Sequence, residues 1–202
     1  MIIVDVETSG LNPLKHSILS IGAVDFFNPS NQFYGECKIP EGAEIDEKAL
    51  EINGFSQEEI INPEKMELNE LISDFFVWAE KIKPKILSGH NIHFDVSFLK
   101  SAFYKSGLPW VFGHRTVDLH SEGFTHHLKT GREIPIKDDR PNITSDFIHN
   151  YVGLPEEPKP HNALIGAKME AESFSRLIHG KNLFNEFEIY PIPEFLTKFH
   201  KD

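Results

Sequence analysis

Asp5 and Glu7 lie two residues apart at the end of the apolar segment that opens the chain. In a β-strand, side chains at positions i and i+2 leave the same face, so this spacing predicts two carboxylates that point together. They come directly before the Thr8-Ser9-Gly10 turn, and the ends of strands are where ligands meet α/β sheets. Carboxylate oxygens prefer hard divalent cations such as Mg²⁺ and Mn²⁺. A single Asp-x-Glu pair is also typical of a solvated strand end, so further residues have to support a metal site.

Two later segments carry polar residues at the start of predicted helices. Asp95 follows a short apolar segment and opens a helix, where the ordinary role of an acid is to cap the helix or stabilise its first turn. His161 and Asn162 precede another helix, with Asn162 as its predicted cap. An imidazole titrates near neutrality, so His161 is either a surface residue or a general base.

Taken together, the three segments resemble the motifs of the DEDD-type 3′→5′ exonucleases, in the branch that uses histidine as general base. The first motif is residues 4–11, the second is residues 90–95 with Phe98 and Leu99 after it, and the third begins at His161-Asn162-Ala163. The resemblance runs from residue 1 to about residue 180. It implies the ribonuclease H-like fold, an α/β fold of three α/β/α layers around a mixed five-stranded sheet.

The resemblance also implies a reaction and the residues that perform it. The enzyme releases nucleoside monophosphates from the 3′ end of single-stranded DNA or RNA, or from a short oligonucleotide, with two Mg²⁺ or Mn²⁺ ions. Asp5 bridges the ions, Glu7 completes the one that activates water, Asp95 helps to position the other, and His161 takes the proton of the attacking water. The substrate contacts that it implies are Thr8, Ser9, Leu11, His90 and Phe94.

The third motif departs from the family at Gly166, where a metal-binding aspartate is expected five residues after His161. Glu170 lies one helical turn beyond Gly166, about 5.4 Å along the axis, and could reach back only in part. We therefore expect weak or Mn²⁺-dependent activity, with Gly166→Asp raising the cleavage rate at least about tenfold. The alternative is a catalytically degenerate module that binds single-stranded nucleic acid or nucleotides.

Hydrophobic periodicity predicts the elements that must bring these residues together. Three strands in succession come first, and short strands then alternate with helices, which is typical of a layered α/β domain. The segment after Glu44 has helical spacing, and residues 125–141 form a polar, exposed loop with four basic side chains. We predict strands over residues 2–6, 18–27, 32–39, 85–89 and 116–119, and helices over 68–79, 95–106, 143–152 and 163–179.

Composition limits the partners. The 202 residues include 20 Lys and Arg against 31 Asp and Glu, which gives a formal net charge of −11. This charge repels polyanions at long range, so a nucleic acid must be attracted by local basic groups or by bound metal. The chain length favours one domain, residues 1–180, followed by an aromatic tail, residues 181–202, that packs on the domain or on a partner such as a second copy in a homodimer.

The cysteine content and the N-terminal segment predict the compartment. Cys37 is the one cysteine in the sequence and cannot form an internal disulfide. The chain reaches the charged Asp5 at once, which does not fit a secretory signal, and it has no apolar run of about 18 residues. These features predict a cytoplasmic protein with no membrane segment.

Overall fold

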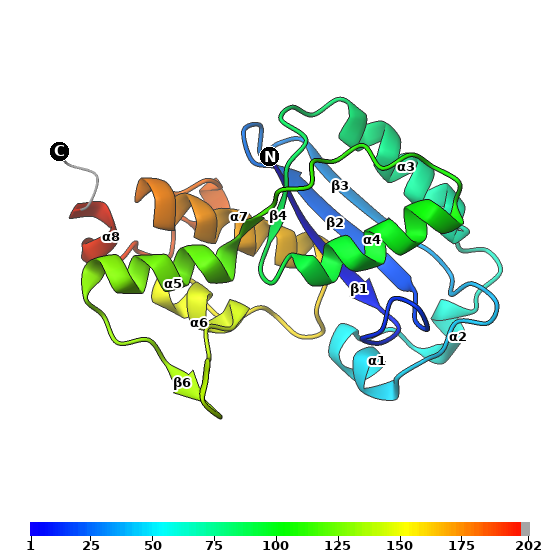
Figure 1. Cartoon of the computed structure of the whole chain (residues 1–202), viewed down its shortest axis with the longest axis horizontal. Coiled ribbons are helices and arrows are strands. Elements are labelled where there is room, and N and C mark those ends of the chain that lie inside the picture. Colours follow the sequence, from blue (N-terminus) through cyan, green and yellow to red (C-terminus); the bar gives the residue numbers. More distant parts are fainter. Residues whose placement is uncertain (199–202) are drawn as a thin grey trace.

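The computed structural model describes residues 1–198 and contains one mixed five-stranded sheet in the order β3-β2-β1-β4-β5 (Figure 1). The first three strands form an antiparallel meander, and β4 and β5 continue the sheet in parallel with β1. This confirms the α/β fold with a mixed five-stranded sheet that the family resemblance implies. The strands are β1 Ile2–Thr8, β2 Ile18–Asp25, β3 Gln32–Glu36, β4 Leu87–Gly89 and β5 Val117–Asp118.

Helices occupy the connections from β3 to β4 and from β4 to β5, and further helices follow β5. Each predicted helix is present, with bounds that differ by two residues or fewer. None of the helices in residues 1–198 has the length and apolar composition needed to cross a bilayer. The helices are α1 Glu47–Asn53, α2 Gln57–Ile60, α3 Leu68–Glu80, α4 His93–Lys105, α5 Leu119–Thr130, α6 Ser145–Tyr151, α7 Ala163–His179, the 3-10 helix η1 Asn185–Phe187 and α8 Glu194–Lys198.

Alternation along β1 divides the core into two layers. Ile2 and Val4 belong to the apolar cluster that β1 shares with α3 and α4, whereas Ile3 belongs to the cluster on the opposite face, which includes α7. Helix α7 lies so close to the sheet that a Cβ on Gly22 of β2 would overlap the backbone of Ala163. Asp5 and Glu7 share the parity of Ile3 and therefore lie on the α7 side.

The expectation of an exposed loop over residues 125–141 is wrong in part. Helix α5 continues to Thr130, and a short hairpin follows, made of β6 Ile136–Lys137 and β7 Arg140–Pro141. The buried positions of α5 recur every four residues, but two of the three are Gly123 and His127, which carry no apolar signal. The helical period was therefore invisible to a hydrophobicity pattern.

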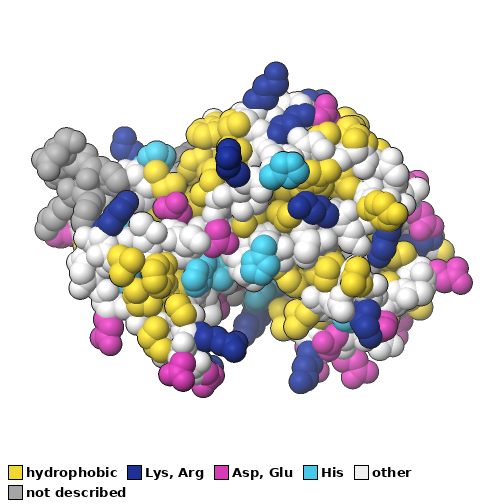
Figure 2. All heavy atoms as spheres, in the orientation of Figure 1, with side chains coloured by type: hydrophobic (Ala, Val, Ile, Leu, Met, Phe, Trp, Pro, Cys, Tyr) yellow, Lys and Arg dark blue, Asp and Glu magenta, His cyan; other side chains and the backbone are white. Residues whose placement is uncertain are grey.

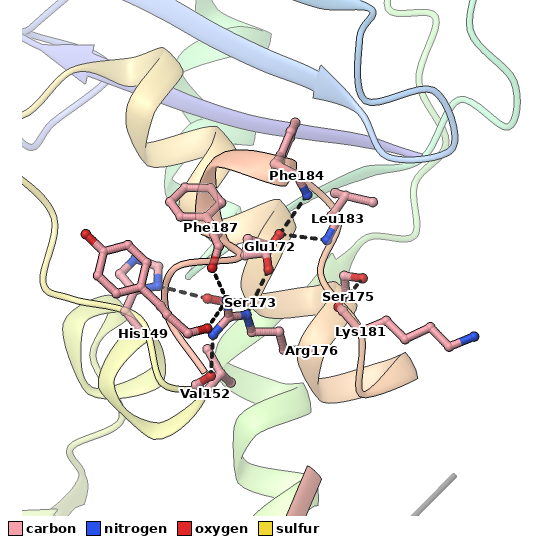
Figure 3. A network of polar contacts seen from close by, with 11 residues as sticks. His149, Val152, Glu172, Ser173, Ser175, Arg176, Lys181, Leu183, Phe184 and Phe187 are labelled. Carbon is pink, nitrogen blue, oxygen red and sulfur yellow. Dashed lines mark hydrogen bonds and ion pairs between the residues drawn. The ribbon is translucent and has the colours of Figure 1, made fainter. Parts of the chain in front are cut away.

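A buried ion pair holds the segment after α7 against the body of the protein (Figure 3). Glu172 accepts hydrogen bonds from Arg176 and from the backbone amides of Leu183 and Phe184. Arg176 in turn donates to the carbonyl oxygens of Val152, Phe187 and Tyr190. Within the described residues, this part of the aromatic tail therefore packs on α7; Phe199, also assigned to the tail, lies outside them.

Candidate active site

The two carboxylates of β1 lie on one face near the end of the strand. Asp5 points toward the first turns of α7, where it meets Gly166, and Glu7 is 9% exposed. Asp95, in the first turn of α4, reaches the same pocket from the face of the sheet that α4 covers. Its Oδ1 accepts a hydrogen bond of 3.0 Å from the backbone amide of Val6, and its side chain is buried. Asp95 is thus a first-turn acid that is tied to β1.

The entry to α7 positions His161. Asn162 caps the helix by accepting hydrogen bonds from the amides of Leu164 and Ile165, which agrees with the sequence prediction. The backbone amide of His161 donates to the carbonyl oxygen of Ile52, so α1 fixes the residue from the other side. The imidazole is 29% exposed and its Nδ1 lies 3.7 Å from Glu157 Oε2.

These side chains line one pocket of about 290 Å³. Residues from β1, α4 and the start of α7, which are far apart in the sequence, meet there. Six of the residues predicted for the site line it, and five others that were not predicted for it line it as well. The predicted ones are Asp5, Glu7, His90, Phe94, Asp95 and His161, and the others are Asn91, His120, Ser145, Glu157 and Glu170.

Two of these other residues are carboxylates, and one of them, Glu170, was considered from the sequence as a partial replacement for the missing aspartate. Glu157 lies in the loop before α7, a Pro-rich segment with no periodicity that could have indicated an inward side chain. Glu170 lies on the predicted inner face of α7, which was the available signal, and it does reach the pocket. Its Oε2, however, lies against β4, 3.1 Å from the position that a Cβ on Gly89 would take. Glu170 therefore adds a deeper carboxylate and does not fill the space beside Gly166.

Gly166 of α7 lies directly against Asp5. A Cβ built on Gly166 would overlap Asp5 Oδ2 and would lie 3.4 Å from Glu157 Oε1. The absent side chain thus leaves no open space at this point, because two carboxylates take it.

Crowding and burial oppose ionisation of the acids. Burial raises the pKa of Asp5 well above its usual range, and the charges of Glu7 and Glu170 raise it further. Burial, with Glu157 as the second cause, raises the pKa of Glu7 to about 7. Burial also raises the pKa of Asp95 to about 8, although the hydrogen bond from the Val6 amide acts in the opposite direction.

The same cluster fits a divalent cation. Glu157 Oε1 and Glu170 Oε2 are buried and have no hydrogen-bond partner among the described residues. Ligand atoms of Glu7, Glu157 and His161 all lie within 4.8 Å of one another. Unsatisfied carboxylate oxygens carry a large desolvation cost, which a hard cation bound among them would offset.

A second, more apolar groove of about 340 Å³ shares Glu7 and Phe94 with this pocket. Leu11, which is 75% exposed, lies along it together with Thr8 and Ile52. An exposed leucine and an aromatic ring beside a carboxylate pocket can stack on a nucleotide base without reading its identity. Thr8 offers no free hydroxyl hydrogen, because its Oγ1 donates to the carbonyl oxygen of Gly10.

Ser9, which was predicted as a substrate contact, lines neither this groove nor the carboxylate pocket. Its side chain is fully buried, and its hydroxyl donates to the carbonyl oxygen of Glu44 and accepts from the amide of Ser17. The backbone amide and carbonyl of Ser9 are also paired, with Ser17 and Asp46. Every polar group of Ser9 thus stabilises the turn after β1, and none remains for a sugar.

His90 supports the pocket wall. Its Nε2 lies 2.9 Å from the carbonyl oxygen of Ile143, which can only accept, so Nε2 carries the hydrogen. Burial lowers the pKa of His90, which keeps the ring neutral.

Charges on the surface are mixed. On the face drawn in Figure 2, Lys and Arg side chains are scattered among acidic and apolar ones, and several histidines gather near the centre. Arg132, from the segment predicted as a basic loop, lies over the ring of Phe195, 3.8 Å from its centroid. That arginine packs on the tail by a cation–π contact instead of extending freely toward a substrate.

The sequence is similar to those of known exonucleases. A family model described as RNase_T, exonuclease, matches residues 2–174. The 3'-5' DNA exonuclease Cap18 of Escherichia coli is 31% identical over 179 residues, which cover 87% of this chain and 89% of the relative. The PolC-type DNA polymerase III of Thermotoga maritima is 33% identical over 110 residues, which cover 54% of this chain and 8% of the polymerase.

Solved structures share the fold. Exonuclease I of E. coli in complex with a dT13 oligonucleotide has a TM-score of 0.69 at 17% identity. The matched region covers 87% of this chain and 40% of the exonuclease chain. Exonuclease I from Methylocaldum szegediense has a TM-score of 0.67 at 18% identity, with coverage of 92% and 42%. This chain therefore spans less than half the length of these exonucleases.

Proposed function

The chain belongs to the RNase_T exonuclease family, and from this premise we propose that it is a divalent-metal-dependent 3′→5′ exonuclease of the histidine branch. We infer that it releases nucleoside monophosphates from the 3′ end of single-stranded DNA. The DNA preference is supported by the relative that is named a DNA exonuclease and by the neighbour that is solved with a dT13 oligonucleotide.

One observation carries the proposal. Asp5, Glu7, Asp95 and His161 come from three separate parts of the chain and line the same pocket. Packing alone gives no reason to collect carboxylates whose pKa values are raised by burial and by one another. A phosphodiesterase has such a reason, since a divalent cation bound by them would supply positive charge to the scissile phosphate and would favour deprotonation of water.

The chain's own groups then have separate tasks. Asp5, Glu7 and Asp95 would hold the cation, and Asp95 keeps its orientation through the Val6 amide. His161 lies at the rim, partly exposed, where it takes the proton of the attacking water. The carboxylate of Glu157, 3.7 Å from His161 Nδ1, stabilises the imidazolium that results. Leu11 and Phe94 hold the terminal base in the adjoining groove.

Gly166 supports a second candidate, a module that binds single-stranded nucleic acid without cleaving it. The two candidates differ in whether nucleotides are released. The test uses 3′-labelled single-stranded DNA and RNA of the same sequence, with Mg²⁺, with Mn²⁺ and with chelator, and an Asp5→Asn variant as control. We expect release of mononucleotides from DNA with Mn²⁺, less with Mg²⁺, and none with chelator or with Asp5→Asn.

Two outcomes would contradict the proposal. Cleavage that persists in chelator would exclude the metal-dependent reaction. Binding of the oligonucleotide without release of nucleotides under any metal would favour the binding module.

A further inference from the structure

Glu157 has a carboxylate oxygen that is not explained by the packing around it. The side chain is only 9% exposed, and its Oε1 is buried with no hydrogen-bond partner among residues 1–198. Its other oxygen, Oε2, faces His161 at 3.7 Å. Leaving a buried carboxylate oxygen unpaired is costly, so a partner that the protein chain does not supply is expected at Oε1.

The direction of Oε1 indicates what that partner is. Oε1 lies 3.4 Å from the position of a Cβ on Gly166, and the same position overlaps Asp5 Oδ2. Ligand atoms of Glu7, Glu157 and His161 lie within 4.8 Å of one another. Oε1 therefore points into the space between β1 and α7 that the acids of β1 also face. Because several carboxylate oxygens face this space, the partner expected there is a cation.

The loop holds Glu157 in place through its backbone. The amide of Glu157 donates to Asp146 Oδ1 at 3.1 Å, which ties the loop to α6. The amide of His161, four residues later, is fixed by Ile52. Because these bonds come from the backbone, a substitution of the Glu157 side chain retains them.

Glu170 is a weaker candidate for this position. Its unpaired Oε2 lies against Gly89, on the β4 side of the pocket. Within the described residues, Glu170 also lies outside the group of Glu7, Glu157 and His161, whose ligand atoms are within 4.8 Å of one another.

We propose that Glu157 is a metal ligand of this enzyme, and that its Oε1 joins Asp5 and Glu7 to supply, from the loop before α7, the carboxylate that Gly166 lacks. The inference rests on the proposed function, because it concerns the same cation. It predicts that the third motif of this chain is complete in space although it is incomplete in sequence.

The experiment measures Mn²⁺ binding directly, without substrate, by titration calorimetry and by the paramagnetic resonance signal of free Mn²⁺. The variant is Glu157→Gln, and the matched control is Glu156→Gln, which removes the same charge from an exposed neighbour. Asp5→Asn tests whether the pocket holds the metal at all. Thermal unfolding in chelator checks that each variant is folded.

We expect Glu157→Gln to weaken Mn²⁺ binding at least about tenfold and Glu156→Gln to leave it within about twofold of the wild type. Unchanged Mn²⁺ affinity in Glu157→Gln, with a loss in Asp5→Asn, would overturn this inference alone, even if cleavage fell, since Glu157 would then only position His161. Unchanged affinity in Asp5→Asn would show that the pocket is not the metal site, and the proposed function would fail with it.

Discussion

Asp5 Oδ2 lies where the side chain of any residue other than glycine at position 166 would begin. A buried carboxylate of β1 and a glycine of α7 are therefore complementary in shape. Glycine within a helix costs about 0.5 to 1 kcal/mol relative to alanine. Here the absence of a side chain at position 166 allows α7 to lie close to the acids of β1.

This complementarity reverses the expectation drawn from the sequence for Gly166→Asp. We expect the substitution to lower the cleavage rate about tenfold instead of raising it, because the new side chain must displace Asp5 and compete with Glu157 for one space. Gly166→Ala has the same steric effect without the charge and serves as the matched control. Initial rates on 3′-labelled DNA are the measurement, and a gain of tenfold or more in Gly166→Asp would contradict the structure-based prediction.

Removal of the proposed general base should slow the chemical step. We expect His161→Ala to reduce kcat by about 10²- to 10⁴-fold, the usual contribution of a general base. His114→Ala, which changes an exposed histidine, should leave kcat unchanged. Single-turnover cleavage gives the rate. Equal rates for the wild type and His161→Ala would exclude the imidazole from proton transfer.

The apolar groove predicts a substrate effect without an effect on chemistry. Leu11→Ala should raise KM about tenfold and change kcat little, since stacking of a base is worth about 1 to 3 kcal/mol. Leu14 is 86% exposed and does not line this groove, so Leu14→Ala is the control. Steady-state kinetics on a short single-stranded DNA would decide. Indistinguishable KM values for the two variants would remove Leu11 from the binding surface.

The raised pKa values predict an unusual pH dependence of stability in chelator. Glu7 and Asp95 titrate near 7 and 8 in the folded protein but near 4 when unfolded. Between about pH 4 and 8 the folded state thus binds more protons, so the free energy of unfolding falls as pH rises. Urea unfolding across this pH range measures the free energy of unfolding. Added Mn²⁺ should restore stability most at the alkaline end.

Asp95→Asn is the control for the pH experiment. The amide keeps an oxygen that can accept from the Val6 amide but cannot ionise. We expect a shallower loss of stability with pH in this variant. Superimposable pH curves for the variant and the wild type would show that Asp95 keeps an ordinary pKa.

The ion pair between Glu172 and Arg176 predicts a large effect on stability far from the site (Figure 3). Both side chains are fully buried. Glu172→Gln should lower the free energy of unfolding by about 3 to 5 kcal/mol, because it leaves the guanidinium buried without a counter-charge. Glu186→Gln removes the half-exposed partner of Lys168 and should cost less than about 1 kcal/mol. Urea denaturation compares them, and equal losses would contradict this view of the pair.

Short-range sequence patterns were enough to predict several local features of this protein. Alternation in residues 2–8 was enough to predict that Asp5 and Glu7 share a face, because the period of a strand is a property of the backbone. The cap at Asn162 and the helix that follows were equally local, since a cap acts on amides two and three residues ahead. The order of the elements indicated a layered α/β domain, and the mixed five-stranded sheet was implied by the family resemblance of the three motifs.

Contacts between distant segments were decided only by the tertiary structure. Glu157 lies in an aperiodic loop, so nothing in its neighbourhood indicates that one of its oxygens is buried beside Asp5. The opposite holds for Ser9, whose position in the first motif indicates a contact, while its polar groups are all occupied by distant partners, Ser17, Glu44 and Asp46. In the sequence, Gly166 indicates a missing metal ligand, whereas in the structure it allows α7 to lie against Asp5. Periodicity describes a residue relative to its own element, whereas a site depends on the distances between elements, and these are set by how the layers pack.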